Sequence, residues 1–308
     1  MDENVLLEIL SEYYGIEHPS LEFLREGGGH TFIVNGKTKY LLKVIGGAFA
    51  DTARQSVSLM RYLEGNSFPV PKTILAKDGN AIMETEADGE KKLITLMEFI
   101  EGDEPDLKER ASDIGALTGR LHLLMEQYPA KPVSHDRDFF IGRYLEYLRK
   151  KNYPRLDAFE KLGENSWEKV RNLPQGICHG DLHRGNLLQS ADGQIYLIDF
   201  DTVCGAPLMF DIMVMCDMTD YFNLKQDDIS VTKEAYRKFL SGYSAYRPLS
   251  REEVLSFPDW IVIRHFQLQA TILDIYGIDC IDENFIDGQL YWLNRWQDQV
   301  QDWRITGR

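Results

Sequence analysis

The hydrophobic pattern of the chain changes character near residue 102. Before it, short strand-like apolar runs dominate, and helical periodicity is confined to residues 3–14 and 50–64. Beyond it, apolar positions recur mainly at helical spacing, beginning with residues 107–126. The two patterns predict an α+β fold, in which a small, mainly antiparallel sheet with one inserted helix precedes a larger, mainly helical region.

Turn residues separate the strand-like runs, which are residues 21–25, 31–34, 39–45, 81–84 and 92–99. Asn35-Gly36 lies between two runs and is typical of a hairpin turn. Later helical patterns cover residues 138–151, 155–172, 232–244 and 250–274, with strand-like runs at 175–178, 186–189 and 195–200. Because residues 101–105 read as a linker, we predict two lobes, residues 1–101 and residues 102–308.

Composition excludes several classes of protein. The 308 residues are 44% hydrophobic and 27% charged, which is typical of a globular chain. The 34 basic and 49 acidic residues give a net charge of −15, which argues against a nucleic acid or an anionic membrane as partner. No apolar run approaches the roughly 18 residues that span a bilayer. Nothing in the pattern indicates an oligomeric state.

The first residues and the cysteines indicate a cytoplasmic protein. Residues 1–4 are acidic, so we expect no signal peptide. The cysteines show no CxxC spacing, which argues against structural zinc and favours reduced thiols. They are Cys178, Cys204, Cys216 and Cys280.

The most specific chemical pattern combines HGDLHRGN at residues 179–186 with IDFD at residues 198–201. Phosphoryl transfer needs a carboxylate that orients and deprotonates the attacking hydroxyl group. It also needs oxygen ligands, such as an amide and a second carboxylate, that hold Mg²⁺ beside the ATP phosphates. Asp181, Asn186 and Asp199 supply these groups in this order.

These motifs resemble those of the aminoglycoside phosphotransferase family and its relatives, the choline, homoserine (type II) and methylthioribose kinases. The resemblance extends over nearly the whole chain, including the pair Leu121-His122 that ends a long helix. It implies a bilobal protein-kinase-like fold and an enzyme that uses ATP and Mg²⁺ to phosphorylate a hydroxyl group of a small molecule. It further implies Asp181 as catalytic base, Asn186 and Asp199 as magnesium ligands, and His179 as a loop-shaping residue.

The resemblance also implies that the first lobe binds the nucleotide. Alternation along its strand places Lys43 near a glycine-rich turn, where an ammonium group suits the ATP phosphates. Lys37 and Lys39 are the competing lysines. The implied nucleotide-binding residues are Lys43, Gly28, Gly29, Met97, Glu98 and Ile100.

One position departs from the family pattern. A glutamate on the helix after the lysine strand usually pairs with that lysine, whereas residues 52–61 contain no glutamate. Gln55 and Ser56 occupy this region. A polar residue therefore substitutes, or another acid such as Asp51 pairs with Lys43, or Lys43 is held differently.

The second lobe is expected to bind the acceptor. Only 11 residues separate Asp199 from Asp211 and no APE triplet follows, which favours a small molecule over a polypeptide. Acids interleaved with aromatic residues suit an amine-bearing, cationic acceptor, although a solvated acidic surface is the plainer interpretation of most of them. The acids that we expect in the pocket are Asp217, Asp220 and Asp274.

Three residues keep two interpretations. His183 contacts substrate or phosphate, or has no such role; Asp201 is a second acid beside the metal or an acceptor in a turn. Asp211 ties the loop to the following helix or caps that helix. Two alternatives to a small-molecule kinase also remain: a stress-type Ser/Thr protein kinase on the same fold, and a non-catalytic nucleotide-binding or spore-coat-type relative, which the missing glutamate favours.

Overall fold

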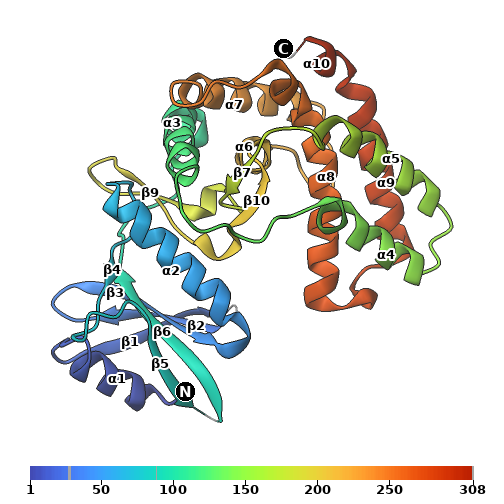
Figure 1. Cartoon of the computed structure of the whole chain (residues 1–308). Helices are drawn as coiled ribbons and strands as arrows, with labels where there is room; N and C mark the ends of the chain where they lie inside the picture. The colour runs from blue at the N-terminus through green and yellow to red at the C-terminus, as the bar shows by residue number, and fades with distance from the viewer. Residues whose placement is uncertain (27–28, 88, 307–308) are drawn as a thin grey trace. The chain divides into compact units, whose positions relative to one another are not determined.

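The computed structural model describes residues 1–26, 29–87 and 89–306, which form two compact units (Figure 1). Unit 1 comprises Met1–Pro105 together with Arg184–Val203, and unit 2 comprises Asp106–His183 together with Cys204–Arg308. The predicted domain boundary at residues 101 and 102 stays a prediction. The described residues contain no helix of the length and apolar character that a membrane crossing requires.

The core of unit 1 is an antiparallel sheet in the order β1-β2-β3-β6-β4, with β5 also paired to β6. Its strands are β1 (Ser20–Glu26), β2 (Gly29–Asn35), β3 (Lys39–Gly46), β4 (Thr73–Ile74), β5 (Met83–Ala87) and β6 (Glu90–Glu98). The hairpin predicted at Asn35-Gly36 is confirmed, since β2 and β3 pair from Asn35↔Lys39 onward.

Two helices cover opposite faces of this sheet (Figure 1). Helix α1 (Glu3–Glu12) buries Leu6, Ile9 and Leu10 against a face that includes Leu42 and Val44 of β3. Helix α2 (Ala50–Gly65) follows the short helix η1 (Gly47–Phe49) and contacts β3 and β6. Side chains alternate along a strand, so the residue between Leu42 and Val44 points away from the α1 face.

A second hairpin of unit 1 comes from a distant part of the chain. The short helix η3 (Arg184–Asn186) leads into β8 (Leu187–Gln189), which pairs antiparallel with β9 (Ile195–Leu197). The backbone N–H of Ile198 donates to the carbonyl of Asn186 (3.0 Å). Helix η4 (Phe200–Thr202) follows and contacts α2.

Unit 2 is mainly helical. Its helices are α3 (Leu107–Met125), the π-helix η2 (Asp138–Gly142), α4 (Arg143–Lys150), α5 (Leu156–Val170), α6 (Met209–Cys216), α7 (Asp228–Tyr243), α8 (Arg251–Tyr276), η5 (Ile278–Cys280), α9 (Glu283–Gln299) and α10 (Gln301–Thr306). Hydrophobic periodicity predicted no helix beyond residue 274, so α9 and α10 were not expected from the sequence. Strands β7 (Gln175–Cys178) and β10 (Cys204–Pro207) pair antiparallel.

Helices α3 and α7 pack at very close range. A Cβ atom at Gly115 would lie 2.0 Å from the carbonyl oxygen of Phe239, and one at Gly242 would lie 1.8 Å from that of Ser112. Only glycine allows this approach. The packing holds the carboxyl end of α3, with its buried residue His122, against the end of α7.

Candidate functional site

The loop that follows β7 carries the HGD motif of unit 2. Cys178 of β7 lies opposite Cys204 of β10 in the antiparallel strand pair, which fixes the end of β7. Two residues later, Gly180 adopts a left-handed conformation with φ of +86°. Glycine adopts this conformation at little cost, whereas other residues are strained by it. The turn at Gly180 therefore directs the following residue, Asp181, out of the strand.

A buried carboxylate holds this loop. Asp211 on α6 accepts hydrogen bonds from the backbone N–H groups of His179 (2.6 Å) and Gly180 (2.9 Å). His122 Nε2 donates to the same carboxylate (3.0 Å), and His122 Nδ1 lies 2.8 Å from the Tyr243 hydroxyl. Asp211 thus ties the loop to α6, α3 and α7. No side chain caps the first turn of α6. Of the two interpretations of Asp211, cap of the helix or tie to the loop, the structure therefore shows the tie to the loop.

Asp181 lies between two basic side chains of unit 2. Its carboxylate is 3.2 Å from Nη2 of Arg264 on α8 and 3.4 Å from Nε2 of His183. Burial raises the pKa of Asp181, but the hydrogen bond with His183 and the charge of Arg264 outweigh it and lower that pKa below its usual value. The carboxylate is therefore ionised at neutral pH and can accept a proton.

Arg264 was not among the site residues predicted from the sequence. The residue lies in the buried stretch Trp260–Phe266 of α8, where the preceding side chains, including Ile263, are fully buried. A buried charge needs a partner, so a lone arginine in an apolar run was the signal that could have identified it.

In unit 1, two aspartates pair with Lys43. The Lys43 ammonium lies 2.8 Å from Asp201 and 3.3 Å from Asp199. Burial lowers the pKa of Lys43, but the two carboxylates outweigh burial and raise it, so the lysine remains charged. Asp199 and Asp201 are therefore the ion-pair partners that Lys43 has in place of the missing glutamate. Asp51, the other acid considered, pairs with Arg54 instead. Lys43 is therefore held differently from the family pattern.

Asp199 adopts a conformation that is unusual for its residue type. Its φ of +65° is left-handed, and such strain in a non-glycine residue is often found at functional sites. Besides Lys43, its carboxylate contacts the guanidinium of Arg25 on β1 (2.8 Å). Burial raises the pKa of Asp199, but Lys43 and Arg25 outweigh it and lower that pKa to about 2.

The residues of unit 1 also have the chemistry of a magnesium site. The hydrogen bond from Ile198 to Asn186 brings the buried Asn186 alongside the segment that presents Asp199. Amide and carboxylate oxygens are hard ligands of the kind that Mg²⁺ prefers. Within the described ranges no group of three or more His, Cys, Asp or Glu side chains forms a metal cluster, so an ion here would need other oxygen ligands as well.

One other predicted nucleotide-binding residue, Met97, shares the Lys43 face of the sheet. Strand pairing sets Lys43 opposite Thr95 and sets Leu41 opposite Met97, which is buried. The backbone N–H of Glu98 donates to the carbonyl of Lys72 (2.8 Å) and is therefore occupied.

Two other predicted positions lie at the margins of this sheet. A Cβ atom at Gly29 would lie 2.1 Å from the carbonyl oxygen of Val44, so only glycine fits there. Ile100 follows the end of β6. Gly28 lies outside the described residues.

Comparison with known proteins decides the family. Residues 20–249 match the model of the phosphotransferase enzyme family. The chain belongs to this family.

Two known relatives of this phosphotransferase carry the names of small-molecule kinases. It is similar to a homoserine kinase of Methylobacillus flagellatus (25% identity over 255 residues, 80% of this chain and 76% of the relative). It is also similar to an amicoumacin kinase of Bacillus subtilis (23% identity over 303 residues, 92% of this chain and 88% of the relative). The chain is thus a small-molecule kinase, as the motifs predicted.

A solved structure confirms the predicted α+β, protein-kinase-like fold. An amicoumacin kinase in complex with AMP-PNP, Ca²⁺ and Ami superposes with a TM-score of 0.77 at 18% identity, covering 97% of this chain and 94% of the other.

The three acids predicted to line the acceptor pocket of this kinase differ in their surroundings. Asp220 pairs with Lys225 (3.0 Å), and Asp274 pairs with Arg143 (2.6 Å). Asp217 has no ion-pair partner among the described residues and accepts the backbone N–H of Thr219 (2.9 Å). Burial raises the pKa of Asp217 to about 6. Of these three acids, only Asp217 thus lacks an ion-pair partner among the described residues.

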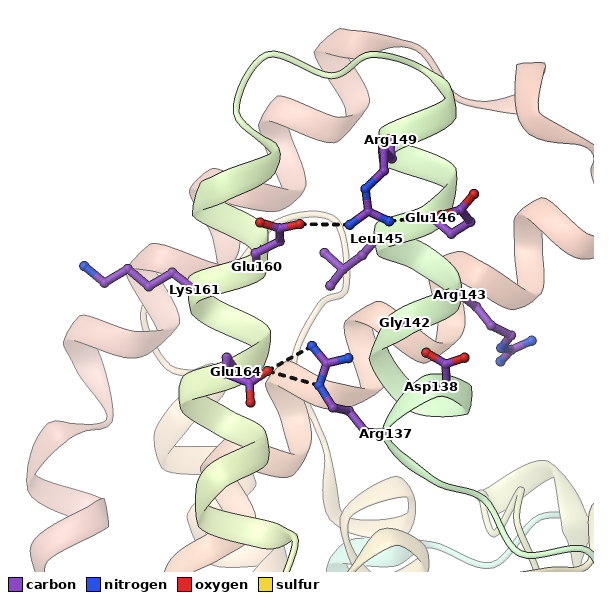
Figure 2. A pocket seen from close by; sticks show the side chains of 10 residues that line it. All are labelled: Arg137, Asp138, Gly142, Arg143, Leu145, Glu146, Arg149, Glu160, Lys161 and Glu164. Atoms are coloured by element: carbon purple, nitrogen blue, oxygen red, sulfur yellow. Dashed lines mark hydrogen bonds and ion pairs between the residues drawn. The ribbon is translucent and has the colours of Figure 1, made fainter.

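Figure 2 shows a groove in unit 2 that lies between α5 and the segment formed by η2 and α4. Arg137 pairs across it with Glu164 (2.9 Å), and Arg149 pairs with Glu160 (2.9 Å). None of the residues predicted from the sequence lines this groove, and its main charges are already paired. We therefore place no function in it.

Proposed function

We propose that this phosphotransferase moves the γ-phosphoryl group of ATP to a hydroxyl group of a small, amine-bearing molecule. The observation that supports this proposal most directly is the ionised Asp181 carboxylate, which lies on a loop whose backbone N–H groups donate hydrogen bonds to Asp211. Asp181 accepts the proton of the acceptor hydroxyl while that oxygen forms its bond to the γ-phosphorus. The bond from phosphorus to the bridging oxygen then breaks, and ADP leaves.

Asn186 and Asp199 would hold Mg²⁺ in this proposal, and Lys43 would bind the phosphates. When bound, Mg²⁺ neutralises charge on the phosphate oxygens. The Lys43 ammonium is kept charged and in place by Asp201 and Asp199. Asp201 is thus, in our proposal, a positioning residue for the lysine.

The nucleotide would bind to the sheet lobe, residues 1–101, near Gly28, Gly29 and Met97. Its adenine ring would meet the backbone of Glu98 and Ile100. Residues 102–308 would form the lobe that binds the acceptor. We also propose that the enzyme is cytoplasmic, in line with the absence of membrane-spanning helices among the described residues.

The acceptor belongs to the class represented by homoserine, amino alcohols and aminoglycosides. The curated relatives named above carry the names homoserine kinase and amicoumacin kinase. Asp217 supports an amine in the acceptor, because it is an acid without an ion-pair partner among the described residues. His179 supports the loop, and His183 contacts the base.

A panel assay tests the proposal. Purified enzyme, ATP and Mg²⁺ are incubated with amino acids, amino alcohols and aminoglycosides, and phosphorylated products are detected by mass spectrometry. We expect one chemical group of acceptors to yield a monophosphate. Absence of any product, with no thermal stabilisation by ATP and Mg²⁺, would favour the non-catalytic alternative, and phosphorylation of the protein itself would favour the protein-kinase alternative.

A further inference from the structure

Arg264 is a cation placed directly beside the proposed base. Its Nη2 atom lies 3.2 Å from Oδ1 of Asp181, and only 17% of its side chain is exposed. Both residues belong to unit 2, so α8 presents this charge where the acceptor hydroxyl would bind. The base and the cation form one feature of the acceptor site.

The guanidinium of Arg264 is fixed before any ligand binds. Its Nη1 donates to Gln267, whose amide donates to the hydroxyl of Thr271 (3.2 Å). Its Cζ atom also lies 5.8 Å from the centre of the Phe210 ring. A side chain held from three directions loses little conformational entropy when it binds a ligand.

Arg264 still has unused hydrogen-bond donors. A guanidinium carries five N–H groups. Within the described part of the chain, Asp181 and Gln267 are its hydrogen-bond partners and take one N–H each. Two of the five N–H groups are thus assigned, and the part of the side chain that is exposed, 17%, leaves the guanidinium open to a ligand. Such a fork suits a carboxylate, which can accept two parallel hydrogen bonds.

The charges around Asp181 restrict the acceptor further. A guanidinium beside the base repels an ammonium group close to the reacting hydroxyl and attracts an anion. The charge of Arg264 also acts on Asp217: burial raises the pKa of the Asp217 carboxyl, and Arg264 lowers it. A hydroxyl-bearing amino acid carries a carboxylate for Arg264 and an ammonium group for Asp217.

We propose that Arg264 determines specificity by binding a carboxylate of the acceptor, which makes hydroxyl-bearing amino acids the substrate class. The inference rests on the kinase function proposed above and narrows its acceptor. Polycationic aminoglycosides and simple amino alcohols lack this carboxylate and are poor acceptors. Arg264 keeps its contact with Asp181 through one N–H while its free N–H groups bind the substrate.

Matched acceptor pairs test this assignment. L-Homoserine and 3-aminopropan-1-ol differ only in the carboxylate, as do L-serine and ethanolamine, and L-threonine and 1-aminopropan-2-ol. We expect the wild type to prefer at least one acid over its amino alcohol by about 10- to 100-fold in kcat/KM, the range of one charge-assisted contact.

Variants separate binding from positioning. We expect Arg264→Gln to reduce the preference for the acid over its amino alcohol to a few-fold in kcat/KM, mainly by raising KM for the acid. Arg264→Lys, which keeps the positive charge, should retain part of this preference. Arg171→Gln removes an exposed charge that pairs with Glu168 (2.9 Å) and is the control that keeps the wild-type preference. An equal loss of kcat with both acceptors in Arg264→Gln would instead assign Arg264 a positioning role and overturn the proposal.

Two further outcomes distinguish this inference from the kinase function. Phosphorylation of amino alcohols or aminoglycosides in preference to the acids refutes the substrate class and leaves the kinase function intact. Absence of ATP-dependent product with every acceptor refutes the kinase function. Calorimetric titration of each pair into the wild-type protein with ADP needs no turnover, and failure of all three acids to bind more tightly than their partners also overturns the inference.

Discussion

Replacement of Asp211 by asparagine tests how the catalytic loop is held. The Asp211 carboxylate is fully buried and accepts the N–H groups of His179 and Gly180 and of the His122 ring. Asparagine has nearly the same shape, but it has one acceptor oxygen and turns an N–H₂ group toward donors. At least one buried donor therefore loses its partner.

The magnitude follows from these hydrogen bonds. A hydrogen bond to a charged group contributes about 1.5–3 kcal/mol, and a buried donor left unpaired costs about 1–3 kcal/mol. Because one or two of the three hydrogen bonds break, we expect Asp211→Asn to lower the free energy of unfolding by about 2–4 kcal/mol. That decrease is a large share of the stability of a typical domain, about 5–15 kcal/mol.

Urea unfolding followed by circular dichroism measures this change. Asp298→Asn is the control, because Asp298 is exposed on α9 and has no hydrogen bond or ion pair among the described residues, so its effect should stay within about 0.5 kcal/mol. We also expect kcat to fall in Asp211→Asn while ATP affinity is retained. A destabilisation below about 1 kcal/mol with unchanged kcat would contradict the role given to Asp211.

Three other predictions concern charges of the two units. Asp201→Asn removes the 2.8 Å partner of Lys43, so kcat/KM for ATP should fall about tenfold, the value of one charge-assisted contact; an unchanged value would show that Asp199 suffices. Arg25→Gln frees Asp199 from a competing cation, so Mg²⁺ should bind several-fold more tightly in a direct titration without nucleotide; weaker binding would contradict this competition. The Asp217 carboxyl ionises as pH rises through about 6, so KM for an amine-bearing acceptor should fall across that range in the wild type and not in Asp217→Asn. Burial raises this pKa from its usual value near 3.8 to about 6, so the folded protein holds the proton more tightly than the unfolded chain does. As pH rises from about 3.8 to about 6, the free energy of unfolding of the wild type should therefore fall relative to that of Asp217→Asn.

Local patterns predicted the elements of the fold well. The Asn35-Gly36 turn placed β2 and β3 in one hairpin, and helical periodicity over residues 50–64 corresponds to α2. The helix predicted for residues 250–274 is α8, whose start is fixed by a capping box between Ser250 and Glu253. These signals depend on neighbouring residues, so the sequence alone contains them.

Contacts between distant residues could not be predicted in this way. Lys43 meets Asp201 and Asp199 across more than 150 residues of chain, and no local pattern records that pairing. Arg264 meets Asp181 across 83 residues. The predicted site residues were named from motif order, whereas their ion-pair partners follow only from the packing of the sheet and helices.

The sharpest test of the account is the comparison of Asp181→Asn with the wild type on an acceptor that the panel identifies. Asparagine preserves the shape of the side chain but cannot accept the hydroxyl proton at a useful rate. We predict that kcat falls at least about 100-fold while the affinity for ATP, measured by calorimetry, changes less than about threefold. Product formation by Asp181→Asn at a rate close to that of the wild type would contradict the assignment of Asp181 as the base.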